Sequence, residues 1–493
     1  MELNDYLHKD ATSLAASIEA AETSAEELVS LARQRYDEVN HSINAIVAPL
    51  WEYADDQISH GLPNGPLRGV PMSVKNLGQF IKGQITSAGS RLFAENVADH
   101  DSTLVKRYKA SGLVIFGKSN TPEFGLATTT EPVLHGPTRN PFNLEYSAGG
   151  SSGGAAAAVA AGISPIAHAS DGGGSIRIPA GCCGLFGLKP TRGRNPLGPT
   201  TLEGWGGLST THAITRSVRD SALVLDCSHG EEAGSPYRSK DPLKSFQDLM
   251  KRDPGNLRVA YFTEPFNGAS LDPEVLSIVN KTAEILASTG HAVEELTNAF
   301  DPEVCKDSHG TLAISHIGAM LQKLEAHTGK PITEKDVERV TWNNFQSSKV
   351  ISGADYASAL NQIHQHGRMI DEIFNDYDLI LPPTMACMTP LIGELNTMSD
   401  DTDSYLTLLY QMIGFTALIN DTGHPAASLP LGACTDGMPV GSQLVAPFGR
   451  KIYFTNWASS SSRKTVSPKS PFSRQLSPNQ PDGSPPEDAK IAT

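Results

Sequence analysis

Two serines in glycine-rich stretches are the residues of this chain best suited to chemistry. Ser151 lies within Gly149–Gly154, and Ser175 lies 24 residues later within Asp171–Arg177. Glycine lets the backbone adopt left-handed turns that other residues rarely adopt, and it lets a substrate approach the backbone closely. Serine is a weak nucleophile until a base removes its proton. Lys75, which lies upstream in the sequence, is the candidate for that base. These residue types predict a hydrolase that activates serine without histidine.

Lys75 can serve as that base only when it is neutral, because an ammonium group has no lone pair. Burial favours the neutral form and lowers the pKa of a lysine. Val70, Met72, Val74 and Leu77 are apolar neighbours, so they predict a partly dry setting for the amine. A solvated surface position is the ordinary alternative for a lysine.

Other kinds of chemistry have weaker support in the sequence. The first glycine-rich run lacks the Gly-Lys-Ser/Thr ending of a phosphate-binding loop. His168, or His424 with Asp421, could suggest a Ser-His-Asp triad, but we expect both histidines to be packed or hydrogen-bonded. Cys182 and Cys183 have no neighbouring histidine or metal motif, so we expect packing roles for them. We expect neither a metal ion nor an organic cofactor.

The order of several motifs resembles the amidase signature family of serine amide hydrolases. The similar stretch runs from about Ala11 to Arg450, and its most specific part is Gly149–Thr191. Further matching motifs lie at 117–124, 215–220, 379–384 and 422–426. Within the family, the segment His168–Ser175 is most similar to the branch that contains 6-aminohexanoate cyclic dimer hydrolase.

The resemblance implies amide hydrolysis through an acyl-enzyme. It implies that Ser175 is the nucleophile and Lys75 the base, with Ser151 as a bridging serine that relays the proton. It also implies a cis peptide bond between Gly150 and Ser151. Ser152 is the rival for the bridging role, and the sequence does not separate the two.

The resemblance also suggests which groups support the reaction. The oxyanion hole is expected at the backbone N–H groups of Gly172, Gly173, Gly174 and Ser175. Asp171 and Arg177 are expected to brace this loop, an ordinary surface ion pair being the alternative. Asn76 stands where family members commonly have aspartate, and the missing charge would shift the pH optimum.

Two other functions stay open at this point. One is the glutamine-hydrolysing A subunit of a tRNA-dependent amidotransferase, and the other is an inactive or scaffolding homologue with a damaged C-terminus. The intact Lys75, Ser151 and Ser175 oppose the inactive homologue. The expected substrate is a small linear or cyclic amide. Its pocket is expected to involve Phe124–Thr129, His316–Leu321 and Gln411–Ile419.

Alternating helices and apolar strands must position these residues, and they predict an α/β fold. The resemblance implies a central mixed, twisted β-sheet covered by helices on both faces. Ser24 and Glu27 have the form of a capping box that opens a helix. Expected helices lie at 104–110, 155–162, 273–290 and 312–328, the last two as walls of the substrate cleft. Expected strands lie at 70–77, which places Lys75 at a strand end, and at 113–117, 378–382 and 426–431.

Composition narrows the setting in which the chain works. The 493 residues carry 39 basic and 54 acidic side chains, and the net charge of −15 argues against nucleic-acid binding. The sequence contains no run of about 18 apolar residues, so we expect no membrane-spanning helix. The first residues lack the pattern of a secretory signal, so we expect a cytoplasmic protein. A homodimer is expected from the resemblance.

We expect one domain at 1–450, with its catalytic core at about 65–220, followed by an atypical tail at 451–493. The tail carries six basic and three acidic residues, which reverses the charge of the body. Nine serines and six prolines within 458–493 predict disorder. A shifted reading frame is one interpretation of this abrupt change.

Overall fold

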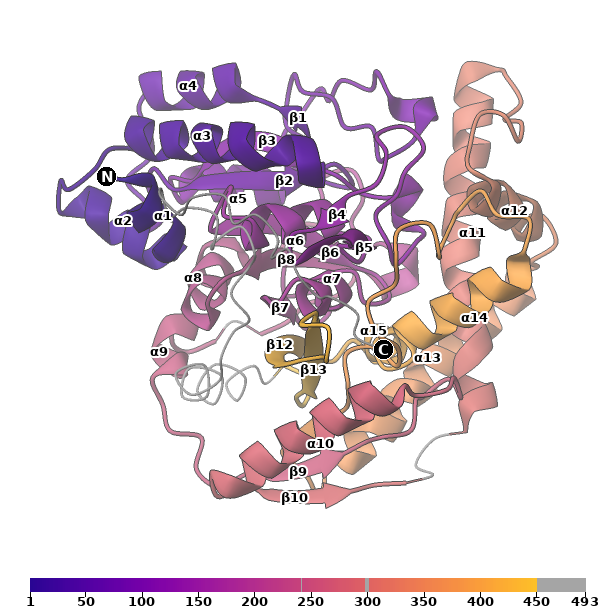
Figure 1. Ribbon diagram of the computed structural model, residues 1–493. Coiled ribbons are helices and arrows are strands. Elements are labelled where there is room, and N and C mark those ends of the chain that lie inside the picture. The colour runs from indigo at the N-terminus through magenta and orange to yellow at the C-terminus, as the bar shows by residue number, and fades with distance from the viewer. Residues whose placement is uncertain (241, 298–300, 450–493) are drawn as a thin grey trace, which may run out of the picture.

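One large sheet runs through the molecule and carries the predicted catalytic segments near its middle. The computed structural model describes residues 1–240, 242–297 and 301–449, so the predicted tail and the domain boundary before it lie outside the described residues (Figure 1). The 11-stranded sheet has the order β1-β3-β2-β6-β8-β7-β12-β13-β11-β9-β10. Its strands are β1 Ile46–Pro49, β2 Pro71–Lys75, β3 Val114–Ser119, β6 Ile166–Asp171, β7 Phe186–Lys189, β8 Thr210–Thr215, β9 Arg258–Tyr261, β10 Ala292–Glu295, β11 Leu379–Leu381, β12 Ala426–Ala433 and β13 Pro439–Val445.

The sheet is mixed, with its parallel pairs in two separate groups. Strand β2 runs parallel to β3 and to β6, and β9 runs parallel to β10 and β11. The strands between these groups pair antiparallel, including β6 with β8 and β12 with β13. A separate two-stranded sheet joins β4 (Arg139–Asn140) to β5 (Asn143–Ser147). The predicted α/β fold with a mixed sheet is confirmed.

Helices cover both faces of the sheet, because successive strand residues point to opposite sides. In β6, Ile166 packs with the apolar side chains of α2, α5 and α8, whereas Ala167 and Ala169 pack with those of α6 and α7. Figure 1 shows α1–α4 at one end of the molecule, and α10 with β9 and β10 at the other. These helices are α1 Leu3–His8, α2 Ala11–Glu19, α3 Ala25–Ile43, α4 Trp51–Ser59, α5 Thr103–Ala110, α6 Gly153–Ala160, α7 Arg177–Cys182, α8 Val218–Ser228, α9 Phe246–Met250 and α10 Pro273–Ser288.

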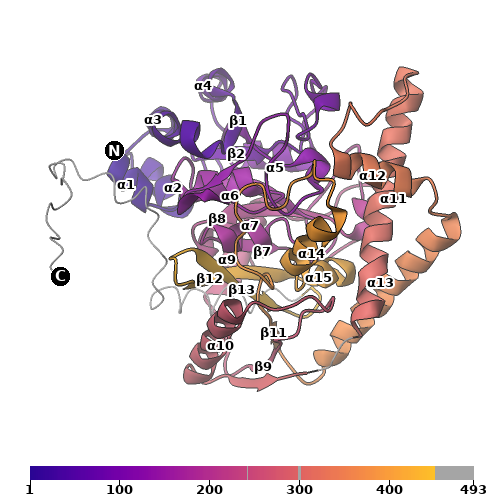
Figure 2. The same cartoon turned by 45° about the vertical axis from the view of Figure 1, so that its right-hand side comes forward.

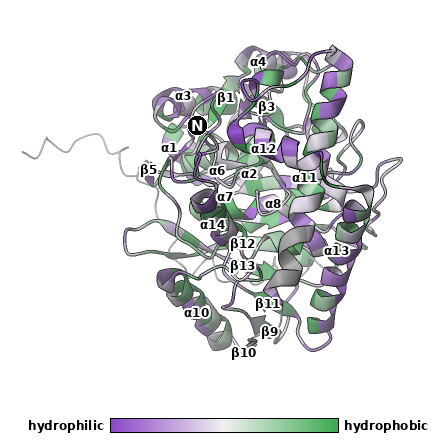
Figure 3. Cartoon of the chain, turned by 90° about the vertical axis from the view of Figure 1, so that its right-hand side faces the viewer, coloured by the Kyte–Doolittle hydropathy of each residue, from purple (hydrophilic) through white to green (hydrophobic). Residues whose placement is uncertain are grey.

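The later helices gather on one side of the sheet. Helix α11 packs against α12 and α13, and Figure 2 shows these three helices together. Hydrophobic and hydrophilic residues mix along α10 and α13 in Figure 3, as expected for helices with one buried face. The bounds are α11 Pro302–Thr328, α12 Arg339–Ser348, α13 Gly353–Ile373, α14 Thr402–Ile413 and α15 Ala417–Thr422. No helix in the described part of the chain is long and apolar enough to cross a membrane.

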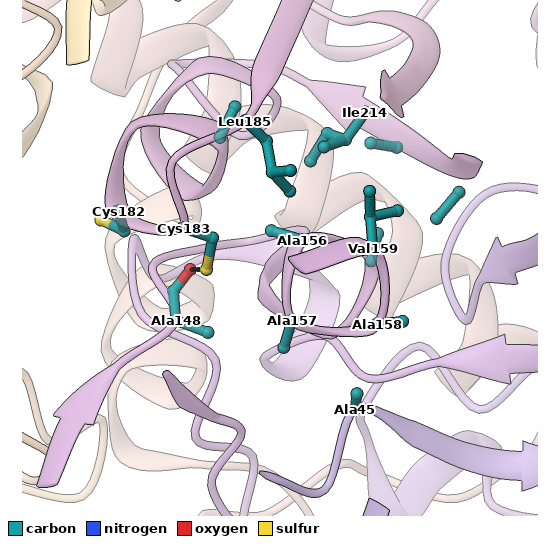
Figure 4. Close-up of a cluster of buried hydrophobic side chains, with 14 of the residues drawn as sticks. Ala45, Ala148, Ala156, Ala157, Ala158, Val159, Cys182, Cys183, Leu185 and Ile214 are labelled. Atoms are coloured by element: carbon teal, nitrogen blue, oxygen red, sulfur yellow. Dashed lines mark hydrogen bonds between the residues drawn. The ribbon is translucent and has the colours of Figure 1, made fainter. Parts of the chain in front are cut away.

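Helix α6 is the closely packed centre beneath the predicted site. Its residues from Gly153 to Val159 are all buried, and four consecutive alanines let neighbouring backbone approach. A Cβ atom on Gly154 would lie 2.2 Å from the backbone nitrogen of Asn120, so only glycine fits there. Figure 4 shows the small side chains of this helix among Ala45, Ala148, Cys183, Leu185 and Ile214.

Most predicted elements are present, and the start of α3 shows the predicted local contacts together with two more. Helix α3 begins after Ser24, whose hydroxyl accepts the N–H of Glu27 at 3.2 Å as predicted. The Glu27 carboxylate accepts from the N-terminal ammonium of Met1 and from the Thr23 hydroxyl, because both of these donors lie beside the first turn. These bonds, together with one from the backbone of Ser24, lower the pKa of Glu27.

Candidate active site

Strand ends and one helix start bring the predicted residues together. The parallel strands β2 and β6 end at Lys75 and Asp171, and carboxyl ends of parallel strands meet at one edge of a sheet. Ser151 and Ser152 directly precede α6, which packs against both strands. The loop that follows β6 carries Ser175 and leads into α7.

Three serine hydroxyls surround the side chain of Lys75. Its Nζ lies 2.7 Å from Ser151 Oγ, 2.9 Å from Ser152 Oγ and 3.1 Å from Ser170 Oγ. The lysine is fully buried, and burial lowers its pKa to about 7 although the charge of Asp171 acts in the opposite direction. A large share of the amine is therefore neutral near pH 7, as a base requires.

Ser170 is the member of this cluster that the sequence analysis did not single out. Its carbonyl accepts the Ser152 hydroxyl at 3.2 Å, and its own N–H approaches Ser152 Oγ at 3.4 Å. Ser170 is the next-to-last residue of β6, two residues after His168. The alternation of side chains along a strand was the available signal, since it places both residues on the same face.

Ser151 and Ser175 line the same cavity, which has a volume of about 410 Å³. The peptide bond between Gly150 and Ser151 is cis, as the resemblance implied. Ser175 is 9% exposed, and its hydroxyl has no hydrogen-bond partner within the described residues. A substrate carbonyl in the cavity could therefore reach the Ser175 hydroxyl, which no hydrogen bond from the described residues holds in place.

The loop between β6 and α7 is folded around the Asp171 carboxylate. This group accepts the N–H of Gly174 at 2.8 Å and of Ile176 at 3.1 Å. The Gly174 N–H is therefore already engaged, unlike the free donor expected from the sequence. Three other N–H groups of the loop have no hydrogen-bond partner among the described residues: Gly172, Gly173 and Ser175.

Asp171 and Arg177 form a buried pair, so the surface alternative is wrong. Two hydrogen bonds join them, Nε to Oδ2 at 3.0 Å and an Nη atom to Oδ1 at 2.9 Å, with both side chains fully inaccessible. Burial raises the pKa of Asp171, but the charge and hydrogen bonds of Arg177 outweigh it and hold this pKa well below its usual range. Arg177 also donates to Asn420 on α15 and to Gln443 on β13, which anchors the loop to both elements.

His168 has a structural place behind the lysine. Its Nδ1 accepts the backbone N–H of Lys75 at 3.3 Å, and its Nε2 lies 2.6 Å from the hydroxyl of Thr211. Burial, followed by the charge of Lys75 and of other nearby groups, holds the pKa of His168 well below its usual value. The ring is thus neutral, and the expectation of a hydrogen-bonded histidine is confirmed.

Asp421 contacts histidines other than the one suggested by the sequence. Its carboxylate lies 2.7 Å from Nδ1 of His309 and 3.2 Å from Nδ1 of His366. His424 contacts Asp371 instead, at 3.0 Å. The other ring nitrogen of His309 lies 3.0 Å from where a Cβ atom on Gly173 would be. This pair therefore packs against the loop that carries Ser175.

The cavity wall agrees only in part with the expected pocket segments. Phe124 and His316, each from an expected segment, line it, but no residue of 273–290 or Gln411–Ile419 does within the described chain. Thr416 packs behind the wall, where it donates to the Gly173 carbonyl at 2.7 Å, whereas α10 packs on β12 and β13. The wall residues that the sequence analysis missed come from two further stretches: Leu77, Gln79, Phe80, Thr86, Ala88, Phe93, Asn96, Leu197, Thr200, Thr201, Glu203, Trp205, Ser209, Thr210 and Thr211.

Three residues beside the predicted site, Cys182, Cys183 and Asn76, have structural roles. Cys182 and Cys183 are buried, and burial raises the pKa of the Cys182 thiol to about 12. Asn76 donates to Ser87 Oγ at 2.7 Å and accepts its N–H at 3.1 Å. These contacts hold the loop after β2.

The comparisons with known proteins agree with this geometry. Residues 27–451 match the family model described as Amidase. The chain belongs to the amidase family. It is 37% identical to 6-aminohexanoate-cyclic-dimer hydrolase of Paenarthrobacter ureafaciens, covering 90% of this chain and 92% of that enzyme. An acylamidase of Rhodococcus erythropolis is 33% identical over 88% and 91% of the two chains.

Solved structures show the same relationship. The structure of 6-aminohexanoate cyclic dimer hydrolase superposes with a TM-score of 0.88 at 35% identity, covering 94% of this chain and 98% of that one. A bacterial aryl acylamidase of the amidase signature family superposes with a TM-score of 0.85 at 26% identity, covering 94% and 98%. The enzyme is thus an amide hydrolase with the amidase signature fold, and the Ser-Ser-Lys triad is characteristic of this family.

Proposed function

We propose that this enzyme cleaves a non-peptide carboxamide through an acyl-enzyme on Ser175, with Ser151 as proton relay and Lys75 as base. The observation that carries the proposal is the 2.7 Å contact between Lys75 Nζ and Ser151 Oγ, at the wall of the cavity that Ser175 also lines. A buried lysine with a pKa near 7 in such a place is a suitable base.

Acylation moves one proton along this chain of groups. Neutral Lys75 takes the proton of Ser151, which takes that of Ser175 as the Ser175 Oγ bonds to the substrate carbonyl carbon. The proton then returns through Ser151 to the amide nitrogen, and the C–N bond breaks to release an amine. Water attacks the ester in the second half-reaction by the same route, which restores Ser175 and releases the acid.

Ser151 suits the relay better than Ser152. The Ser152 hydroxyl donates to the Ser170 carbonyl, so its proton is committed away from Lys75. Ser152 is also completely buried, whereas Ser151 reaches the cavity. We therefore assign Ser152 and Ser170 to accepting the N–H groups of neutral Lys75, which aims the lone pair of the amine at Ser151.

The unpaired N–H groups of Gly172, Gly173 and Ser175 are the proposed oxyanion hole. Preorganised donors at the position where negative charge develops typically contribute about 3–4 kcal/mol each. Gly174 supports the hole indirectly, because its bond to Asp171 fixes the shape of the loop.

A labelling experiment tests these assignments. A fluorophosphonate probe should modify the parent enzyme on Ser175, as located by peptide mass spectrometry, and should not label Ser175→Ala. Hydrolysis of small amides should fall by about 10³-fold or more in Ser175→Ala and in Lys75→Ala, with the fold retained by circular dichroism. Full activity in either folded variant would refute the proposal.

The similar enzymes suggest the general class of substrate. The similar enzymes include a cyclic-dimer hydrolase and an acylamidase, so we propose both cyclic and linear amides as substrates. A panel of linear amides, anilides and cyclic diamides would rank them. Glutaminase activity together with a co-purifying subunit would favour the amidotransferase alternative. The homodimer and the cytoplasmic location stay predictions, which light scattering and cell fractionation test.

A further inference from the structure

The catalytic cavity has one acidic side chain and no lysine or arginine among the described residues that line it. The acidic residue is Glu203, which is half-buried in the stretch before β8. Most of the remaining wall is apolar or aromatic, with Phe80, Phe93, Phe124 and Trp205 as its rings. Cavities of this kind gain specificity from a few polar groups on an apolar wall.

The Glu203 carboxylate has neutral neighbours and one more distant cation. The Tyr237 hydroxyl hydrogen-bonds to it. His316 lies on the same cavity wall, and burial lowers the pKa of its ring although Glu203 acts in the opposite direction. No salt bridge joins Glu203 to a lysine or arginine within the described chain, but its charge opposes the burial that lowers the pKa of Arg192.

Arg192 is the cation whose charge interacts with Glu203, but three of its N–H donors are used elsewhere. Its guanidinium donates to the carbonyl of Gly207, and to those of Asn420 at 2.8 Å and Asp421 at 2.7 Å. It also lies over the Tyr237 ring, 5.3 Å from the centroid. Arg192 therefore braces the back of this wall, and the carboxylate remains available to the cavity.

Trp205 connects this acidic wall to the reaction centre. Its ring carbons lie 2.9 Å from where a Cβ atom on Gly172 would be, so the indole packs directly on the proposed oxyanion loop. Glu203 precedes Trp205 by two residues and lines the same cavity as Ser175. A group bound at Glu203 would thus belong to a substrate whose amide reaches Ser175.

We propose that Glu203 is a specificity-determining residue that binds a cationic amino group of the substrate. The enzyme would then prefer amides that carry an ammonium group away from the scissile bond, on either the acyl or the amine part. A carboxylate beside aromatic rings suits an ammonium ion, which it pairs by charge while the rings contribute cation–π attraction. The inference rests on the proposed function, since it assumes that this cavity holds the substrate.

Matched substrate pairs test this preference. One arm compares the 4-nitroanilides of 6-aminohexanoic and heptanoic acid, which place the cation on the acyl part. The other compares N-(6-aminohexyl)hexanamide with N-heptylhexanamide, which places it on the amine part. In at least one arm, kcat/KM should be about tenfold higher for the cationic member, and Glu203→Gln should abolish that ratio. Equal rates in both arms for the parent, or an unchanged ratio in Glu203→Gln, would overturn the proposal.

Binding separates this inference from the proposed reaction. Calorimetry of N-(6-aminohexyl)hexanamide binding to the Ser175→Ala variant measures recognition without turnover. The double variant Ser175→Ala/Glu203→Gln should bind this amide with a Kd about tenfold higher. The control Glu145→Gln removes the same charge from an exposed position on β5 and should leave Kd unchanged. Binding that depends on Glu203 without any hydrolysis by the parent would refute the reaction alone, whereas hydrolysis with Glu203-independent binding would refute the cation site alone.

Discussion

The three hydroxyls around Lys75 are chemically distinct although all are serines. Ser151 faces the cavity, Ser152 is committed to a backbone carbonyl, and Ser170 supports the lysine from the end of β6. A neutral amine has two N–H donors and one lone pair. The Lys75 amine can therefore donate to Ser152 and Ser170 while its lone pair accepts from Ser151. These different roles predict different losses of activity when each serine is replaced.

Replacing the serines one at a time should separate relay from support. Ser151→Ala should lower kcat by about 10²–10⁴-fold, because it removes the proton path between Ser175 and Lys75. Ser152→Ala should lower kcat by only about tenfold, the effect of one lost hydrogen bond to the base. Steady-state kinetics on one amide gives both values, and an equal loss in the two variants would contradict the assignment.

The pKa of Lys75 should set the acid side of the pH profile. With a folded-state pKa of about 7, the amine gains a proton below pH 7 and cannot accept another, so kcat/KM should fall tenfold per pH unit there and level off above. Asn76→Asp should raise this pKa, because it adds a negative charge beside the lysine, and should move the midpoint to higher pH by about one unit. Asn143→Asp adds the same charge at an exposed position and should not move it.

Residue types, spacing and the family resemblance singled out Lys75, Ser151 and Ser175 as candidates. The structure places Lys75 within hydrogen-bond distance of Ser151, and Ser151 and Ser175 line one cavity. Glu203 gave no comparable signal. Its stretch has no strand or helix period, and its position in the wall depends on contacts with Tyr237 and on α11, which lie far along the chain. Such contacts exist only in the folded molecule.

At the scale of elements, the buried Asp171–Arg177 pair joins β6 to α7 and both to the last strands. Removing one charge leaves the other buried and unpaired, so Asp171→Asn should lower the free energy of unfolding by about 3–5 kcal/mol. The double variant Asp171→Asn/Arg177→Met should recover part of this loss because no isolated charge remains. Urea unfolding measures both, and a double variant less stable than the additive sum would contradict this account.

Composition and short local patterns identified the helices over 104–110 and 155–162 and the strand that ends at Lys75, because these are local properties of the sequence. They did not show that Gln411–Ile419 and 273–290 lie outside the cavity wall. An amphipathic pattern shows that a helix has a buried face, but it does not show which neighbour that face meets. Helix α11 therefore lines the cavity while α10 packs on β12 and β13.

At the scale of the whole molecule, Lys118 is a second fully buried lysine. It donates to the Gln79 carbonyl at 2.7 Å and to Thr86 Oγ1 at 3.0 Å, and burial lowers its pKa to about 7. An unfolded lysine has a pKa of about 10.4. Between these two values the unfolded chain binds more protons, so this group lowers stability increasingly as pH falls toward 7.

Lys118→Met should reveal that contribution through its pH dependence. The Tm of the variant minus the Tm of the parent should be highest near pH 7 and should decrease toward pH 10. A change in packing would shift this difference by the same amount at every pH and would not alter the trend. Lys82→Met, at an exposed position, should show a flat difference. Thermal unfolding across this range checks the expectation, which a pH-independent difference for Lys118→Met would contradict.

The bond from Arg177 to Gln443 spans 266 residues, and this separation matters while the protein is being made. Ribosomes add roughly 5–20 residues per second, so about 13–53 s pass between synthesis of the two residues. During that interval the loop that carries Ser175 lacks its hydrogen bond to β13. We therefore expect this loop to reach its final, fully hydrogen-bonded form only after β13 has left the ribosome.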